Sequence, residues 1–168
     1  METKRIVRKI FGEIDTTEIE RLVDETLGSV DGLLAEWLVR YNARRAERGE
    51  EALTMDAWID LSLPLGDARS NAVDRLWRER FIPGMEKLFG EDAQQLGNRK
   101  VNFGAGVVDD GLADLHSYLR VVAHDPDVEE KIAALKRQAA DAGYKPGWVW
   151  HRVEERYGKL AAELLLAE

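Results

Sequence analysis

Apolar residues recur every three or four positions through much of the chain, which is the period of an amphipathic α-helix. The longest such run covers residues 15–48, and its apolar positions are Ile19, Leu22, Val23, Leu27, Val30, Leu33, Leu34, Trp37, Leu38 and Tyr41. Asp15 with Glu18, or Thr17 with Glu20, has the spacing of a capping box at its start. Uninterrupted, this helix has about 32 residues and a length of roughly 48 Å.

Two glycines leave the continuity of this helix open. Gly28 could follow the last turn of one helix and Ser29 could cap the next, which would give two packed helices in place of one rod. The apolar stripe keeps its phase across Gly28 and Gly32, and this favours one continuous or kinked helix.

Shorter helices are predicted on either side of a Pro-Gly boundary. Thr54 reads as the N-cap of a helix that ends at Pro64, and Asp67 or Ser70 begins the next. Pro83 is predicted to break or kink that second helix, because proline lacks the amide hydrogen and its ring crowds the preceding turn.

The second half of the chain is also predicted to be helical, with one exception near residues 99–108. Weak alternation and two glycines there indicate a loop or one short β-hairpin. Asp109 or Asp110 then caps a helix, and Asp127 with Glu130 forms a capping box for another.

That last helix should stop at Gly143, and two helical segments, 148–157 and 159–167, follow it. The first dozen residues are a helix or a mobile arm. Seven or so helices with short connections, and a length of 168 residues, predict a mainly α fold in a single domain, 1–168, in which 143–168 is a candidate docking element.

Composition argues against several classes of protein and of site. No apolar run approaches the roughly 18–20 residues that span a bilayer. The N-terminal residues are not followed by an apolar stretch, so we expect no signal peptide and a cytoplasmic location. The chain has no cysteine, which excludes disulfides, thiolate metal sites and cysteine nucleophiles.

Charge is unevenly distributed along the chain. The formal net charge is −8, and residues 10–39 contribute 1 − 8 = −7 of it. Their acidic residues are Glu13, Asp15, Glu18, Glu20, Asp24, Glu25, Asp31 and Glu36. This acidic segment is either a solvated outer helix face, a docking surface for a basic partner, or an imitation of the charge of DNA.

Two arginine groups follow the acidic segment, one on either side of residue 60. Because arginine contacts phosphate and aromatic rings stack on bases, they are candidates for nucleic-acid contact. These candidates are Arg40, Arg44, Arg48, Arg75, Arg78 and Arg80. Alternatively, Trp77 belongs to the core and the arginines simply cover the solvated faces of their helices. With the acidic segment opposing it, binding to nucleic acid should be weak outside a complex.

No recognised catalytic motif appears. His116 and His124 are eight residues apart, which is not the spacing of a zinc-binding helix. There is no G-x-S-x-G nucleophile turn, and Gly104-Ala105-Gly106 lacks the lysine and hydroxyl of a phosphate-binding loop. We therefore expect no cofactor and no metal, and a protein that binds rather than catalyses.

Trp148 and Trp150 are two residues apart, so on a helix both rings cannot point inward. One exposed tryptophan beside basic residues is typical of a binding hot spot. The candidate partner-binding residues are therefore Trp148, Trp150, His151, Arg152 and Arg156. The alternative is that both rings pack and the element only closes the domain.

Residues 143–158 read Gly-Tyr-Lys-Pro-Gly-Trp-Val-Trp-His-Arg-Val-Glu-Glu-Arg-Tyr-Gly. This segment resembles a short element near the C-termini of some bacterial and phage DEAD/DEAH-type helicases and replication proteins, which reads roughly Gly-aromatic-Lys-x-Gly-Trp-Ala before a basic helix ending aromatic-Gly. The family element continues to Trp-Pro, whereas this chain continues Lys159-Leu160-Ala161. The chain has neither the P-loop lysine nor the Walker B acids, so the resemblance implies a docking element and no ATPase.

These observations predict an accessory or regulatory subunit of a nucleic-acid-processing or mobile-element (phage or plasmid) complex, with a protein as its main partner. One alternative is an acidic inhibitor or DNA mimic that occupies the basic groove of a nuclease or defence complex. Another is an enzyme whose site is built from scattered carboxylates.

Overall fold

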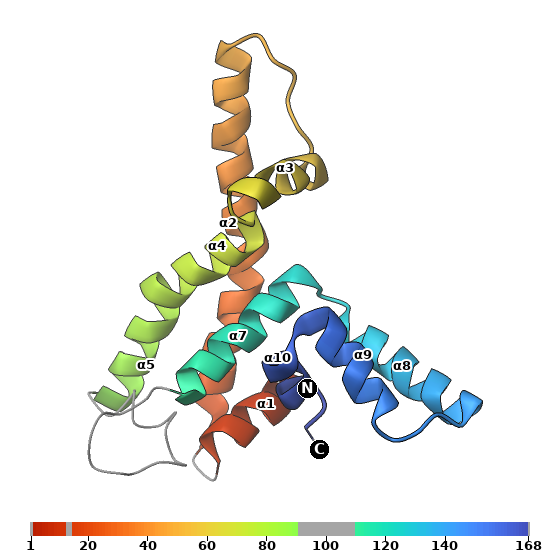
Figure 1. The fold of residues 1–168 in the computed structure, drawn as a ribbon. Coiled ribbons are helices and arrows are strands. Elements are labelled where there is room, and N and C mark those ends of the chain that lie inside the picture. Colours follow the sequence, from red (N-terminus) through yellow and green to blue (C-terminus); the bar gives the residue numbers. More distant parts are fainter. Residues whose placement is uncertain (1, 13–14, 91–109, 168) are drawn as a thin grey trace.

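The computed structural model describes residues 2–12, 15–90 and 110–167 (Figure 1). It confirms the mainly α fold class and a single helical domain. The loop or hairpin predicted near 99–108 lies outside the described residues. No described helix combines the length and the apolar character that crossing a membrane requires.

In chain order the elements are α1 (Glu2–Phe11), α2 (Thr17–Glu47), α3 (Met55–Ser62), the 3₁₀ turn η1 (Leu63–Leu65), α4 (Ala68–Leu76), the π-helical turn η2 (Trp77–Phe81), α5 (Ile82–Phe89), α7 (Asp110–His124), α8 (Val128–Ala142), α9 (Trp148–Tyr157) and α10 (Lys159–Leu165).

Helix α2 is one unbroken helix, as the phase of its apolar stripe favoured. Gly28 and Gly32 lie on its outer side, where no atom of another described part of the chain comes within 4 Å of the position of a Cβ. Its buried residues are Ile19, Leu22, Val23, Thr26, Val30 and Leu34. Beyond Leu34 the helix projects from the body of the protein, and α3 lies beside the projecting part (Figure 1).

Helix α7 forms the centre of the core. It packs against α1, α2, α4 and α10, and Leu115 and Leu119 on it are fully buried. Helix α1 is a packed helix and not an arm. Arg5 Nη2 donates to the Leu165 carbonyl at 2.6 Å, and Lys9 Nζ donates to that of Glu163 at 3.0 Å. The two ends of the chain therefore close against each other.

Pro83 does not break the helix that precedes it. The π-helical turn η2 runs directly into α5, with Phe81 and Ile82 in the right-handed helical region. A proline has no amide hydrogen to donate and its ring crowds the carbonyl four residues earlier, here that of Glu79. The wider π turn accommodates both demands, so the helix continues through the proline.

The capping predictions divide according to backbone conformation. Thr54 and Asp67 are extended (ψ 164° and 121°), and their side chains accept amide hydrogens of the first turn. Thr16 and Asp127 precede α2 and α8 with ψ near 0°, and neither side chain caps the helix. Asp15 does accept the Thr17 amide hydrogen at 3.0 Å, so the predicted cap of α2 is half formed, but Glu18 bonds to Arg21 and Glu20 to the Thr16 hydroxyl, and the reciprocal contact of a capping box is missing. The capping box predicted at 127–130 is wrong, because Asp127 lacks the extended backbone that N-cap residues typically adopt.

Candidate functional site

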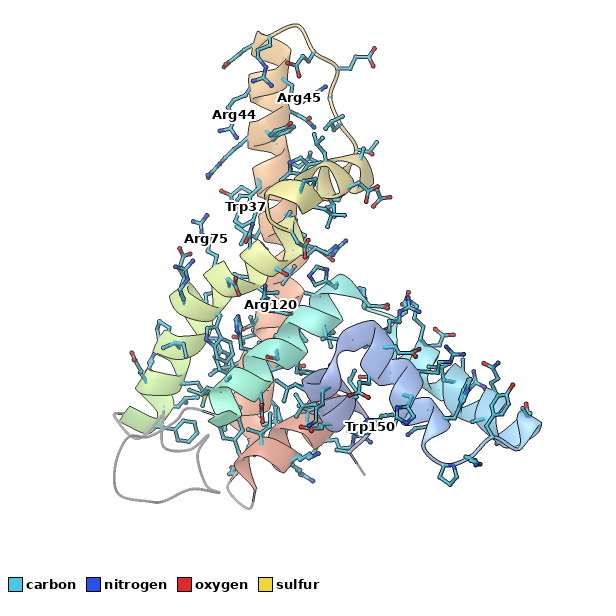
Figure 2. The ribbon with its side chains drawn as sticks, in the orientation of Figure 1. Trp37, Arg44, Arg45, Arg75, Arg120 and Trp150 are labelled. Carbon is cyan, nitrogen blue, oxygen red and sulfur yellow. The ribbon has the colours of Figure 1, made fainter. Side chains whose placement is uncertain are left out.

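An aromatic-arginine groove lies along the C-terminal part of α2, where Figure 2 labels Trp37 and Arg44. It is an open pocket of about 290 Å³ lined by Trp37, Arg40, Tyr41, Arg44 and Trp58. The first four lie on α2 at spacings of three and four residues, so they share one face of the helix. Trp58 comes from α3 and is the buried member, while the Trp37 and Tyr41 rings are half-buried.

A side-chain clamp holds α3 in position beside this face. In the side-chain amide of Asn42, Nδ2 donates to the Leu53 carbonyl at 3.0 Å and Oδ1 accepts the Leu53 amide hydrogen at 2.9 Å. Arg45 Nε donates to the Glu51 carbonyl at 2.7 Å. With this segment fixed to α2, Trp58 meets Tyr41 with ring centroids 6.3 Å apart.

Helix α4 adds a positive charge at the edge of the groove. Arg75 places its guanidinium carbon 5.9 Å from the centre of the Trp37 ring. Arg40 pairs with Glu36 and Arg75 with Glu79, one helical turn away in each case. In the described part of the chain, Arg44 forms no ion pair. Exposed ion pairs contribute little free energy, so the guanidinium groups of Arg40 and Arg75 remain available to another anion.

The remaining candidate arginines lie elsewhere. Arg48 bonds to Glu50 at 2.7 Å, Arg78 donates to a carbonyl of its own helix, and Arg80 donates to the Ser29 hydroxyl at 2.9 Å. None of these lines the groove. The structure therefore gathers Arg40, Arg44 and Arg75 and leaves the other candidates apart.

Sequence reasoning missed Tyr41 and Trp58 as members of this site. Tyr41 could have been found, because it follows Trp37 by four residues on the face that carries Arg40 and Arg44. Trp58 gave no such signal, since only the folding of α3 back onto α2 brings it there.

Several acidic side chains of the acidic segment on α2 pair with arginines. Arg21 bonds to Glu18 at 2.9 Å and also to Glu25. Asp31 lies 3.5 Å from Arg69 of α4. Together with the pair between Glu36 and Arg40, these contacts bring two positive charges from outside the segment, those of Arg40 and Arg69, against its net charge of −7.

At the C-terminal element the predicted residues take different surroundings. Trp148 meets Tyr144 with ring centroids 4.7 Å apart, and the guanidinium carbon of Arg152 lies 5.4 Å from the centre of the Trp148 ring. Trp150 packs against the hydrophobic core. His151 is largely exposed and lies 3.7 Å from Glu154. Both tryptophan rings are half-buried.

Arg156, the last of the predicted partner-binding residues, faces the turn between α7 and α8. Its guanidinium lies 3.7 Å from Asp125. The same carboxylate accepts hydrogen bonds of 2.6 Å from Lys131 and from the Tyr157 hydroxyl. Burial opposes ionisation of Asp125, but these bonds prevail and its pKa is lowered. Burial and the bond to Asp125 raise the pKa of Tyr157 to about 12.

One cluster joins a serine, a histidine and an aspartate. Ser70 Oγ lies 2.8 Å from His124 Nε2 and donates to Asp67 Oδ2 at 3.0 Å. Asp67 Oδ2 contacts that same ring nitrogen. A catalytic relay uses the two ring nitrogens for different partners. This cluster therefore lacks relay geometry, and it fixes the start of α4 against α7.

In the parts of the chain that the structure describes, no three His, Cys, Asp or Glu side chains are placed to hold a metal ion. Comparisons of the chain with protein-family models, with curated proteins and with solved structures find no match.

Proposed function

We propose that this protein is a non-enzymatic accessory subunit of a nucleic-acid-processing or mobile-element complex, and that the aromatic-arginine groove contacts nucleic acid. The observation that carries the proposal is that arginines of two groups lie at one aromatic groove. Arg40 and Arg44 of α2 line the same pocket as Trp37, and Arg75 of α4 lies over the Trp37 ring. Guanidinium groups beside aromatic rings form the usual contact surface for a single strand.

A single strand suits this groove better than a duplex. A base can stack on the half-buried rings of Trp37 and Tyr41 only when it is unpaired. Arg44 is placed to contact the phosphate next to such a base. Non-specific duplex binding depends instead on many basic contacts along a surface, whereas this groove offers three arginines on a chain with a net charge of −8.

The C-terminal element supplies the second half of the proposal, the contact with a protein partner. Trp148, Tyr144 and Arg152 form an aromatic and basic cluster of the kind found at interface hot spots. The resemblance of residues 143–158 to an element of helicases and replication proteins supports the same setting. The ion pairs along α2 favour this proposal over an acidic mimic of DNA.

The test is the binding of a fluorescein-labelled oligothymidine strand, followed by fluorescence anisotropy at several salt concentrations. The variant Arg40→Gln/Arg44→Gln removes two charges from the groove. We expect weaker binding, and a slope of log K against log salt that is smaller by about 0.7 for each phosphate that the variant no longer neutralises.

The matched control is Arg137→Gln on α8, which removes one positive charge at an exposed position outside the groove. It should leave the salt slope unchanged. If the control lowered the salt slope as much, for each charge removed, as the groove variant does, binding would follow net charge alone. That result would contradict the proposal.

A further inference from the structure

A second pocket, separate from the aromatic-arginine groove, lies where α4, α7 and α9 meet. Its volume is about 360 Å³, and Ser117, Arg120, His124, Arg156 and Tyr157 are among the residues that line it. Three of these come from one face of α7, since residues 117, 120 and 124 are three and four apart. Figure 2 labels Arg120 on that helix.

The charged side chains that line this pocket are basic or are histidine. In the described part of the chain, the carboxylates that contact these groups, those of Asp67, Asp74 and Asp125, do not line the pocket. Asp67 contacts His124, and its side chain is only 16% exposed, while that of Asp125 is 12% exposed. Carboxylates in such positions orient basic groups without occupying the space in front of them.

Each arginine of the pocket shares its carboxylate with a nearer partner. Asp125 takes bonds of 2.6 Å from Lys131 and Tyr157, and Arg156 stands at 3.7 Å. Asp74 lies 2.7 Å from His116 and 3.9 Å from Arg120. Within residues 2–12, 15–90 and 110–167, both guanidinium groups therefore keep donors that no close carboxylate takes.

The Ser117 hydroxyl completes the donor set. Ser117 lines the pocket, and no hydrogen bond of its hydroxyl to another described residue is found. Two guanidinium groups from different helices and a hydroxyl surround one space, which suits a tetrahedral oxyanion with acceptors on several sides. A planar carboxylate is better matched by the two parallel donors of a single arginine.

We infer that this pocket binds a phosphate group, held by Arg120, Arg156 and Ser117. Val121 and the Tyr157 ring give the pocket an apolar wall, so the phosphate can belong to a small organic monoester or be inorganic phosphate. This inference does not depend on the aromatic-arginine groove, which shares no residue with the pocket.

The experiment is a titration of the full chain followed by ¹H–¹⁵N NMR, with inorganic phosphate, phenyl phosphate and, as controls, phenol and sodium chloride at matched ionic strength. Saturable shifts of the amides of Ser117, Arg120 and Tyr157 with phosphate, and not with chloride, are expected. Tighter binding of phenyl phosphate than of phosphate identifies an organic monoester as the ligand type. Equal affinity identifies the inorganic ion.

Arg120→Gln and Arg156→Gln should each weaken phosphate binding about tenfold, the loss of one charge-assisted hydrogen bond. Arg137→Gln is the charge-matched control and should bind as the wild type does. Where an arginine variant fails to fold by circular dichroism, Ser117→Ala takes its place with a smaller expected loss. Equal shifts in chloride, or unchanged binding in the folded variants, would overturn the inference.

Discussion

Arg75 of α4 lies over the ring of Trp37 of α2, with its guanidinium carbon 5.9 Å from the ring centre. The contact joins two arginine groups that are distant in sequence. It forms because α4 packs along α2 and presents Arg75 at the level where α2 leaves the core. The cation–π pair at the edge of the aromatic-arginine groove therefore needs both helices.

Leu34 and Val39 of α2 differ sharply in burial, although Leu38 and Tyr41 beyond Leu34 still pack against the core. Leu34 is fully buried, so Leu34→Ala should lower the free energy of unfolding by about 2–5 kcal/mol through reduced burial and the cavity left behind. Val39 is 69% exposed, and Val39→Ala should change it by less than about 0.5 kcal/mol. Urea denaturation measures both. Equal effects would contradict this difference in burial.

The two tryptophans of the C-terminal element should respond differently to truncation. Trp150 packs on the core, so Trp150→Ala should lower stability by about 2 kcal/mol or more. Trp148 contacts Tyr144 and Arg152, and Trp148→Ala should melt close to the wild type. Thermal unfolding tests this contrast. Similar large losses for both variants would show that the element is core and no docking surface.

Alkaline pH should weaken the fold through Tyr157. The pKa of this group is about 12 in the folded protein, against 10.0 ordinarily. Because the folded pKa is the higher one, its stabilising contribution is complete below pH 10 and is lost as the pH rises through about 12. Tyr157→Phe should remove this component, so that its unfolding free energy falls less steeply over this range than that of the wild type. Identical slopes in denaturant titrations would refute the linkage.

Nucleic-acid binding by the isolated chain should be weak. The groove offers few arginines, and the acidic segment of α2 opposes a polyanion, so we expect a Kd of about 1–100 µM at physiological salt. Anisotropy with labelled single strands measures it. A nanomolar Kd with a steep salt dependence would show that more of the arginines, Arg48, Arg78 and Arg80 included, contact the strand.

Local rules predicted most of the fold. The spacing of apolar residues predicted α2, and Thr54 and Gly143 marked a helix start and a helix end correctly. Predictions failed where the backbone decided the outcome. Asp127 has the right side chain for a cap but the wrong conformation. At Pro83 only the break is excluded, since a π turn interrupts the α-helix and then runs directly into α5.

The candidate site was only partly predictable. Arg40 and Arg44 share a helical face, and spacing alone shows this. The arrival of Arg75 and Trp58 at that face depends on how α3 and α4 pack on α2, which is a property of the tertiary structure. Arg78 and Arg80 were grouped with Arg75 because they are close to it in sequence, but neither of them lines the groove.

The most direct test of the central claim is the indole region of a ¹H–¹⁵N NMR spectrum. The chain has five tryptophans, and each indole N–H gives its own signal. On titration with an oligothymidine strand, the signals of Trp37 and Trp58 should shift in step with strand concentration, and that of Trp77 should stay in place. An unmoved Trp37 signal at saturating strand, or shifts confined to Trp148, would contradict binding at the aromatic-arginine groove.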